Sequence, residues 1–405
     1  MTVALILLFC ALAGLVASTG FLVLIIVAAV RFRRRQRTER SLSAEMPAVT
    51  VLKPVCGVEP ALEANLASYF EQDYPRYEII FGARDESDPA IEIARRVSAR
   101  YPHVPVKFVF SGEPEWPNAK VWSLSKMAPS MSHDYLVLSD SDVHVTPTYL
   151  REVVRPLLDP QVGAVTCVYR GVTAGSLSSR IEALGLSVEM TAGVIVADML
   201  EGMTFCLGPT MATRKDVLEA IGGFEALADF YADDYVLGNE VFKSGRTVVL
   251  STYIIDNVLF YQSFKSSISH QVRWMRSTRF SRPAGHASTV LTFAMPFGFL
   301  GLIAGLASGH WGVGLGMFGF AALNRVAMSI AAGWGVVSDR YGLRDAWLYP
   351  VRDLMGFCWW AASYFSNDMV WRQGERYRFQ AGGRMVRIGA ANEKTSEPVA
   401  VDHLS

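Results

Sequence analysis

The sequence predicts an α/β protein in which a mainly parallel, Rossmann-like sheet domain is combined with membrane helices at both ends of the chain. Short apolar runs alternate with amphipathic stretches from residue 48 to about residue 250, a pattern typical of strands joined by crossover helices. No charged residue occurs from Val3 to Val30, and the chain becomes strongly apolar again from about residue 290. The hydrophobic fraction of 51% agrees with such a combination, because it is high for a soluble protein.

Residues 1–30 are predicted to form one N-terminal transmembrane helix. A helix rises about 1.5 Å per residue, so the uncharged run is long enough to cross a hydrocarbon core of about 30 Å. No basic residue precedes Arg31, which argues against a signal peptide. A cluster of six arginines follows: Arg31, Arg33, Arg34, Arg35, Arg37 and Arg40. Because such clusters stay in the cytosol, we expect the N-terminus outside and the basic linker 31–47 inside.

The region 48–265 is predicted to be the cytosolic catalytic domain. Its first half contains four expected strands, at 48–53, 77–83, 104–110 and 135–139, and helical patterns at 58–72, 89–100 and 118–128. In sheets of this kind, ligands bind where the carboxyl ends of the strands meet. The residues that follow the strands are therefore the candidates for chemistry.

Acidic residues follow two of these strands. Asp85 follows the second strand, and Asp140 and Asp142 follow the fourth as Asp-Ser-Asp. Two carboxylates one residue apart can project into the same crevice, and their oxygens suit Mg²⁺ or Mn²⁺. Such a cation would bridge a nucleotide diphosphate and help it to leave. A polar turn with a helix cap is the alternative for this pair, but its position after the apolar run LVLS favours the functional interpretation.

A second acidic pair, Asp233 and Asp234, precedes a helix that we expect to begin near Val236. Adjacent acids at a helix N-terminus can serve as a cap and complement the helix dipole. That explanation accounts for one of them. The other lies among aromatic residues, where partial burial would raise the pKa of a carboxylate and suit it to act as a base. We assign the role of catalytic base to Asp234 and treat Asp233 as its support.

Residues 266–289 are predicted to form an amphipathic helix at the membrane interface. His270, Arg273 and Trp274 occur at spacings of three and four residues, so the three can share one face. A guanidinium suits a diphosphate, and an indole suits the flat face of a sugar. An interfacial belt of Trp and Arg is the alternative explanation. Lys120, at the start of an expected helix, is a further candidate phosphate contact, or else an ordinary surface lysine.

Residues 290–370 are predicted to be a C-terminal membrane region with two to three spans. Residues 292–309 and 311–337 are apolar enough to cross, whereas 346–370 carries charges and either spans or lies at the interface. The arginines after residue 371 favour the cytosol. An outside N-terminus then requires an odd number of crossings, so one of the three late segments is not a full span. Residues 371–405 are expected to be a cytosolic basic segment followed by a disordered tail.

Composition excludes other classes of protein. Lys+Arg and Asp+Glu balance at 38 each, so there is no basic excess to bind nucleic acid. Five scattered cysteines without a CxxC motif argue against a disulfide framework or a zinc site. The apolar stretch 176–206 forms either a groove for an apolar acceptor molecule or part of the core, and the sequence leaves both interpretations open.

Together these motifs resemble family 2-type glycosyltransferases, and most closely the ceramide glucosyltransferase family with its bacterial relatives, the hopanoid biosynthesis-associated glycosyltransferases. The resemblance covers nearly the whole chain. It rests on LKPVCGVEPALEANL (52–66), DYPRYEIIFGARDESDPAI (73–91), NAKVWSL (118–124), SDSDVHVTP (139–147), MATRKDVLEAIGGF (211–224), ADDYVLG (232–238), HQVRW (270–274) and WRQGERYR (371–378).

The resemblance implies a GT-A-like domain at a bacterial inner membrane, facing the cytosol. It implies an inverting, metal-dependent enzyme that transfers a hexose from a UDP-sugar to a lipid hydroxyl. Two acceptor and donor pairs remain: ceramide with UDP-glucose, and a hopanoid such as bacteriohopanetetrol with UDP-N-acetylglucosamine. A processive polysaccharide synthase shares the acidic motifs, but it usually needs more spans than this chain offers. A non-enzymatic membrane protein with a vestigial transferase fold is a further alternative, which the intact acids disfavour.

The family's functional residues map onto matching positions in this chain. The resemblance implies nucleotide contacts at Asp85, Lys120 and Asp140, a metal ion at Asp140 and Asp142, and a base at Asp234. Arg273 and Trp274 would hold the diphosphate and close the site.

One position departs from the family pattern, and another distinguishes its branches. The first position of the [Q/R]-x-x-R-W motif is His270 here, with Gln271 one residue later, so either of the two fills that role. Eukaryotic ceramide enzymes have Gly where this chain has Asp142, which points to the bacterial version.

Overall fold

A computed structural model of the protein describes residues 2–38, 45–59, 61–173, 175–259, 264–371 and 374–390. The chain divides into two compact units. The helical unit comprises residues 1–38, 170–200 and 261–367, and the sheet unit comprises residues 39–169, 201–260 and 368–405. The stretch 170–200, which the sequence analysis assigned to the catalytic domain, therefore groups with the helical unit.

The sheet unit is built on an eight-stranded sheet in the order β3-β2-β1-β4-β7-β6-β8-β5. Its strands are β1 (Val49–Pro54), β2 (Tyr77–Ala83), β3 (Val106–Phe110), β4 (Tyr135–Ser139), β5 (Val143–His144), β6 (Val162–Val172), β7 (Thr210–Arg214) and β8 (Thr247–Val258). The block β3-β2-β1-β4 is parallel, whereas β7 runs antiparallel to both β4 and β6. The four strands predicted from the sequence are therefore the parallel block.

Burial explains why these strands read as continuous apolar runs. Every residue of β2 is buried, and in β1 only the final Pro54 is partly exposed, as expected when both faces of a parallel sheet are covered. The helices of this unit are α2 (Leu62–Ser68), α3 (Pro89–Ser98), α4 (Ala119–Met127), α5 (Tyr149–Val154), α8 (Lys215–Ala220) and α9 (Asp233–Lys243). Asp88 caps α3 by accepting from the Ala90 amide, with proline at the first helical position.

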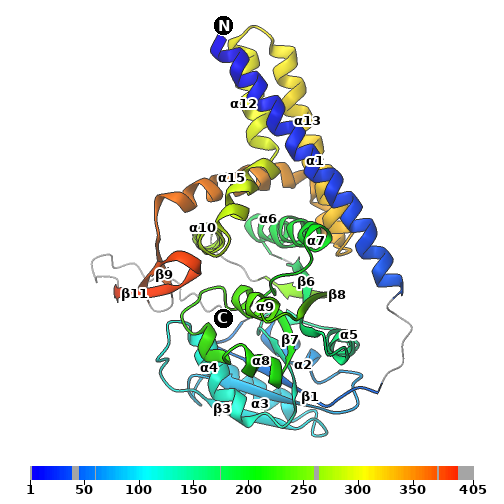
Figure 1. Cartoon of the computed structure of the whole chain (residues 1–405), viewed down its shortest axis with the longest axis vertical. Helices are drawn as coiled ribbons and strands as arrows, with labels where there is room; N and C mark the ends of the chain where they lie inside the picture. Colours follow the sequence, from blue (N-terminus) through cyan, green and yellow to red (C-terminus); the bar gives the residue numbers. More distant parts are fainter. Residues whose placement is uncertain are drawn as a thin grey trace. The chain divides into compact units, whose positions relative to one another are not determined.

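A second, three-stranded antiparallel sheet follows in the order β11-β10-β9. It consists of β9 (Asp368–Trp371), β10 (Glu375–Phe379) and β11 (Met385–Ala390), drawn at the red end of the chain in Figure 1. The sequence analysis expected only a basic segment here, so these strands were missed. The predicted tail after Ala390 lies outside the described residues.

The helical unit contains the apolar segments. Its elements are α1 (Thr2–Thr38), α6 (Leu177–Leu184), the π-helical turn Gly185–Met190, α7 (Thr191–Leu200), α10 (Phe264–Ser281), α11 (Pro283–Ser288), α12 (Met295–Ala307), α13 (Trp311–Ser329), the π-helical turn Ile330–Trp334, α14 (Arg340–Arg344) and α15 (Tyr349–Ala362). Helices α1, α12 and α13 lie side by side (Figure 1) around a core of Leu15, Ala294, Met295 and Ala321.

Three described helices are long and apolar enough to cross a membrane: Val3–Arg37, Leu177–Leu200 and Trp311–Trp334. The pair Pro283–Thr292 and Met295–Ala307, bent by 50°, would be a fourth. The segments expected at 3–30 and 311–337 correspond to two of these candidates, and the segment expected at 292–309 falls within the bent pair. Leu177–Leu200 was not predicted as a span.

The segment expected at 346–370 does not form a long apolar helix. It contains α15, of 14 residues, and ends in β9. The side chains of Arg352 and Asp353 in α15 are buried, and Asp353 pairs at 3.1 Å with Arg325 of α13. Buried partners within the unit therefore compensate the charges that made this segment ambiguous in the sequence.

Candidate active site

The Asp-Ser-Asp loop begins directly after β4, at the carboxyl end of the parallel block. Lys53, at the end of the neighbouring β1, donates from Nζ to the carbonyl oxygen of Asp140. Asn65 of α2 donates to the carbonyl oxygen of Ser141 at 3.2 Å. Lys53 and Asn65 are both buried, so two interior side chains fix the backbone of this loop.

Lys120 links the two acidic motifs. Its Nζ lies 2.6 Å from Asp140 Oδ1 and 3.7 Å from Asp233 Oδ2. Asn118, the N-cap of α4, donates through Nδ2 to Asp233 Oδ1 at 3.3 Å. The ammonium of Lys120, in the first turn of α4, therefore pairs with both Asp140 and Asp233, although 93 residues separate these two acids in the sequence.

Asp234 faces the same space as Asp140. Helix α9 begins at Asp233, three residues before the expected start, so both acids lie in its first turn. Asp234 Oδ2 accepts from the Gly208 amide at 2.7 Å, and Oδ1 accepts from the Tyr235 amide at 2.7 Å. A Cβ at Gly208 would lie 3.3 Å from Asp234 Oδ2 and 3.7 Å from Asp140 Oδ2. Both carboxylates therefore point at one small space that the absence of a side chain at Gly208 leaves open.

Asp142 has the properties of a carboxylate that can hold a cation. Its Oδ2 accepts from Asn257 Nδ2 of β8 at 2.9 Å, while the buried Oδ1 has no hydrogen-bond partner among the residues that the structure describes. Burial and the neighbouring charge of Asp140 raise the pKa of Asp142. An unsatisfied buried oxygen beside a second carboxylate fits a hard divalent cation.

Few side chains at this site could coordinate a metal ion. Within the described ranges, no group of three or more His, Cys, Asp or Glu side chains is arranged to hold a metal ion. Mg²⁺ is commonly bound through one or two protein carboxylates, with substrate phosphates supplying further oxygens. Asp140 and Asp142 therefore fit a cation that is shared with a phosphorylated substrate rather than enclosed by the protein.

Electrostatics separates the roles of Asp234 and Lys120. Burial and the charge of Asp233 raise the pKa of Asp234, and the two amide hydrogen bonds oppose this only in part. Burial lowers the pKa of Lys120, but Asp140 and Asp233 raise it by more, so the ammonium stays charged. The site thus combines a carboxylate suited to accept a proton with a permanent positive charge.

Several residues of this site were missed in the sequence analysis. Burial lowers the pKa of Lys53 to about 7 against the opposing charges of Asp140 and Asp142, and its Nζ lies 3.7 Å from the Tyr69 ring centroid. Burial and the charge of Asp142 raise the pKa of Glu59 to about 8. Lys53 could have been found from the sequence, because a lysine at the end of a buried strand is a candidate site residue. Gly208 and Asn257 gave no comparable signal, because their roles depend on strands far along the chain.

Asp85 is at the same edge of the sheet, after β2, with β1 between β2 and β4. Its carboxylate is exposed and accepts from the Ser87 amide at 3.0 Å. Among the described residues its hydrogen-bond partner is Ser87 and not a member of the acidic site, so its role in nucleotide binding stays a prediction.

The residues of the HxxRW motif lie on α10 in the helical unit. The rings of His270 and Trp274 are 4.2 Å apart, as their spacing predicted. Gln271 is buried and accepts from Arg352 Nη2 at 3.0 Å, while His270 Nδ1 lies 3.6 Å from Glu182 Oε1. These contacts stabilise the helix within its unit, and the predicted diphosphate contacts of His270, Arg273 and Trp274 are not tested by them.

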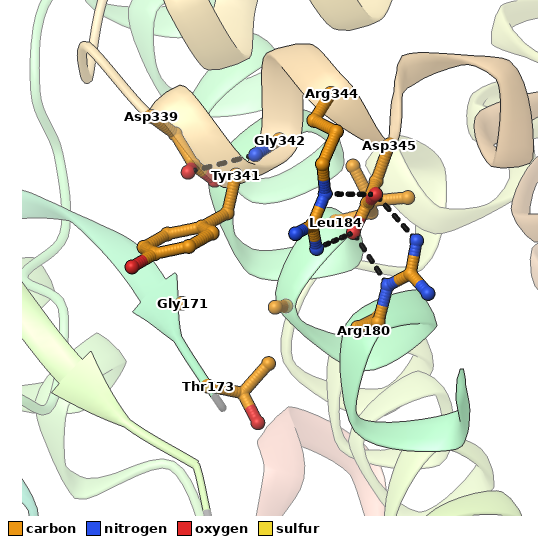
Figure 2. Close-up of a pocket in the computed structure, with 10 residues that line it drawn as sticks. Gly171, Thr173, Arg180, Leu184, Asp339, Tyr341, Gly342, Arg344 and Asp345 are labelled. Atoms are coloured by element: carbon orange, nitrogen blue, oxygen red, sulfur yellow. Dashed lines mark hydrogen bonds and ion pairs between the residues drawn. The ribbon is translucent and has the colours of Figure 1, made fainter. Parts of the chain in front are cut away.

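A pocket within the helical unit is unrelated to the predicted site residues. Figure 2 shows Asp345 between Arg180 of α6 and Arg344 of α14, with Tyr341 and Thr173 nearby. Arg180 Nε donates to Asp345 at 2.7 Å and Arg344 Nε donates to it at 2.9 Å. Both guanidinium groups therefore direct donors to one carboxylate, which ties α6 to the segment around α14.

Comparison with known proteins identifies the family. Residues 11–385 match the model of the family described as Glycosyl transferase family 21. The chain belongs to glycosyl transferase family 21. The match confirms the predicted resemblance to a family 2-type glycosyltransferase of the ceramide glucosyltransferase family. It also confirms the predicted class of enzyme, a glycosyltransferase.

Curated relatives of this family 21 protein include ceramide glucosyltransferases. Ceramide glucosyltransferase 1 of Caenorhabditis elegans is 24% identical over 209 residues, covering 51% of this chain and 45% of the relative. The ceramide glucosyltransferase of Komagataella phaffii is 33% identical over 143 residues, covering 33% of this chain and 28% of the relative. The matched region therefore spans less than half the length of each of these relatives.

A solved structure shares the fold. The mannosyltransferase PcManGT from Pyrobaculum calidifontis, in complex with GDP-Man and Mn²⁺, covers 88% of this chain and 97% of its own, with a TM-score of 0.53 and 19% identity. The likeness confirms the predicted fold class, a GT-A-like α/β sheet domain with apolar helices before and after it in the chain.

Proposed function

We propose that this family 21 protein is an inverting, metal-dependent membrane glycosyltransferase that transfers a hexose from a UDP-sugar to a lipid hydroxyl. The observation that carries the proposal is the position of Asp234 and Asp140, whose Oδ2 atoms face the same space beside Gly208. Inverting transfer requires a base close to the donor site but separate from the groups that hold the leaving diphosphate. In the proposed assignment, Asp234 is that base and Asp140 belongs to the side that holds the diphosphate.

In the proposed reaction, the acceptor hydroxyl oxygen attacks the anomeric carbon of the donor sugar. The bond between that carbon and the diphosphate oxygen breaks, and its electron pair leaves with UDP. The hydroxyl proton moves to Asp234. The pKa of Asp234 is raised and is therefore closer to neutral pH than that of an ordinary aspartate. Configuration at the anomeric carbon is inverted because the hydroxyl and the leaving group occupy opposite faces.

The contacts to the nucleotide-sugar donor are assigned to the residues that the family motifs mark. Lys120 and Asp140 would contact the nucleotide diphosphate, with Asp85 as a further nucleotide contact. Asp140 and Asp142 would hold Mg²⁺ or Mn²⁺, which when bound neutralises charge on the departing diphosphate. Arg273 and Trp274, with His270 or Gln271 at the first position of the motif, would complete the diphosphate contacts.

The relatives named ceramide glucosyltransferases support ceramide as the acceptor and glucose as the transferred sugar. A lipid acceptor also agrees with the three helices that, among the described residues, are long and apolar enough to cross a membrane. The arginine cluster after Val30 supports a cytosolic position for the catalytic domain. The assignment to a bacterial inner membrane rests on Asp142, which stands where eukaryotic ceramide enzymes have Gly.

Membranes that contain the full chain should be supplied with UDP-glucose or UDP-N-acetylglucosamine and with ceramide or bacteriohopanetetrol, and the products followed by mass spectrometry. We expect glucosylceramide from the first pair. N-acetylglucosaminyl hopanoid as the main product would transfer the proposal to the other branch of the family. A polymer without any glycolipid would overturn it in favour of a processive synthase.

A further inference from the structure

The segment that leads into the catalytic acids contacts the C-terminal three-stranded sheet. The Met385 amide of β11 donates to the carbonyl oxygen of Asp229 at 2.7 Å. Phe230 and Arg384 form an isolated antiparallel bridge. All of these residues belong to the sheet unit, although about 150 residues, including the helices α10 to α15, separate the partners along the chain.

Side chains reinforce this backbone contact. The ring of Phe379 in β10 meets the ring of Tyr231 edge-on, with centroids 5.9 Å apart and an interplanar angle of 81°. Phe379 is only 2% exposed, so the contact lies in a packed interior. The guanidinium of Arg384 lies over the Phe230 ring at 5.5 Å from its centroid. Edge-to-face pairs of this kind are worth about 1 kcal/mol beyond the area they bury.

The other contacts of the segment come from the N-cap of α4. The Asn118 amide donates to the carbonyl oxygen of Ala228 at 3.0 Å, and Asn118 Nδ2 donates to that of Phe230 at 2.8 Å. Asn118 and the C-terminal sheet therefore hold the same few residues. Asp234 follows Phe230 by four positions and lies in the first turn of α9, so any shift of this segment moves the carboxylate.

We infer that the C-terminal sheet β9–β11 is a positioning element for the catalytic base, and that Phe379 and Tyr231 are its positioning residues. The inference rests on the proposed function, because it assigns the sheet a part in the work of Asp234. The physical reason is the sensitivity of proton transfer to geometry, in which a displacement of about 1 Å can cost roughly 100-fold in rate. Part of the catalytic site is thus completed by a segment encoded after the membrane region.

A double-mutant cycle in the full-length membrane protein tests this inference. Tyr231→Ala and Phe379→Ala should each lower kcat by roughly 10-fold through misplacement of Asp234, with KM for the UDP-sugar changed by less than about twofold. The double variant should be little slower than either single one, because both remove the same contact.

Val386→Ala is the matched control. Val386 belongs to the same sheet, is 42% exposed and pairs with Arg378, so its truncation should leave kcat unchanged. Effects of the two single variants that multiply to about 100-fold would overturn the inference, because independent residues behave additively in free energy. Parallel losses in kcat, KM and thermal stability would also overturn it, since they would indicate general destabilisation.

Hydrogen exchange separates failure of this inference from failure of the proposed function. The Tyr235 and Gly208 amides donate to Asp234, so their protection reports its position without any turnover. Phe379→Ala should speed exchange at these amides, and Val386→Ala should not. If the wild type transfers no sugar but this difference appears, the proposed function fails and the positioning role stands. If the wild type is active and Phe379→Ala changes neither exchange nor kcat, the inference alone fails.

Discussion

Lys120 Nζ lies 2.6 Å from Asp140 Oδ1 and extends toward Asp233, 3.7 Å away. Lys120 is only 9% exposed, so it compensates two carboxylates in an environment that solvates them poorly. One ammonium thus faces two carboxylates, so removal of the lysine leaves both without their shared positive partner.

Replacing Lys120 by Met should therefore reduce both stability and donor binding. Loss of one partner of a buried ion pair typically costs about 3–5 kcal/mol, because the remaining charge is left uncompensated. Denaturant unfolding in detergent micelles and UDP titration would measure the two effects. Lys243→Met, which removes an exposed lysine paired with Glu240, is the control and should change stability by less than about 1 kcal/mol. Unchanged UDP affinity in Lys120→Met would contradict the phosphate role.

Asp234→Asn should abolish transfer while preserving donor binding. Removal of a general base costs typically 10²- to 10⁴-fold in rate, and the amide keeps the size of the side chain. Single-turnover kinetics with radiolabelled donor would give the loss, and UDP binding by calorimetry would show that the site is intact. Asp216→Asn removes a carboxylate that is 61% exposed and serves as control. Near-normal turnover in Asp234→Asn would mean that another residue is the base.

Activity should fall on the acid side. The pKa of Asp234 is raised to about 6, and a base must be unprotonated, so kcat should rise with pH through about 6 and level off above it. Stability has the opposite sign: because the folded-state pKa exceeds the unfolded value, the contribution of this group is full below about pH 4 and is lost as pH rises through about 6. A pH profile of kcat from 4.5 to 8 with no acid limb would rule out this assignment.

Chelation of divalent cations should abolish transfer, and Mg²⁺ or Mn²⁺ should restore it. Asp142→Asn should raise the Mn²⁺ concentration needed for half-maximal activity by at least about 10-fold, since a neutral amide is a weaker ligand for a hard cation. Mn²⁺ binding followed by electron paramagnetic resonance in the presence of UDP provides a second readout. Transfer that survives exhaustive chelation would exclude the metal role of Asp140 and Asp142.

Gly208→Ala should reduce kcat without unfolding the protein. The new Cβ would lie 3.3 Å from Asp234 Oδ2, close enough to displace that oxygen and to fill the space that Asp140 also faces. A loss of about 10- to 100-fold is expected from a misplaced base. Gly193→Ala is the control, because among the described residues no atom outside its own helical turn lies within 4 Å of the new Cβ. If kcat is unaffected in Gly208→Ala, the reacting atoms do not occupy this space.

Much of the acidic site could be predicted from the sequence, because its signals are local. Strands Tyr77–Ala83 and Tyr135–Ser139 have the predicted bounds, and Asp140 and Asp142 follow the second of them as expected. Continuous burial makes such strands readable, and the strand-end rule then selects the residues that follow. The start of α9 was misplaced by three residues, since helix ends depend on capping contacts that propensity does not reveal.

In the C-terminal sheet, the alternating pattern of strand β10 was present in the sequence, but the many arginines led to a different prediction. Tyr377 and Phe379 of β10 are buried while Arg376 and Arg378 are exposed, which is the alternation of a half-covered strand. The many arginines favoured a cytosolic basic segment instead. The periodicity was present, but its partner, the segment before Asp233, could not be identified from sequence spacing.

The sequence by itself determined the sheet class, the family, the acidic motifs and the apolar segments at both ends, because each is written in neighbouring residues. Only the tertiary structure decided that Lys120 joins Asp140 to Asp233, that Gly208 opens the space between Asp140 and Asp234, and that β11 contacts the segment before α9. These relationships join residues from tens to more than 150 positions apart, and they arise when strands and helices pack. Local periodicity carries no information about such contacts.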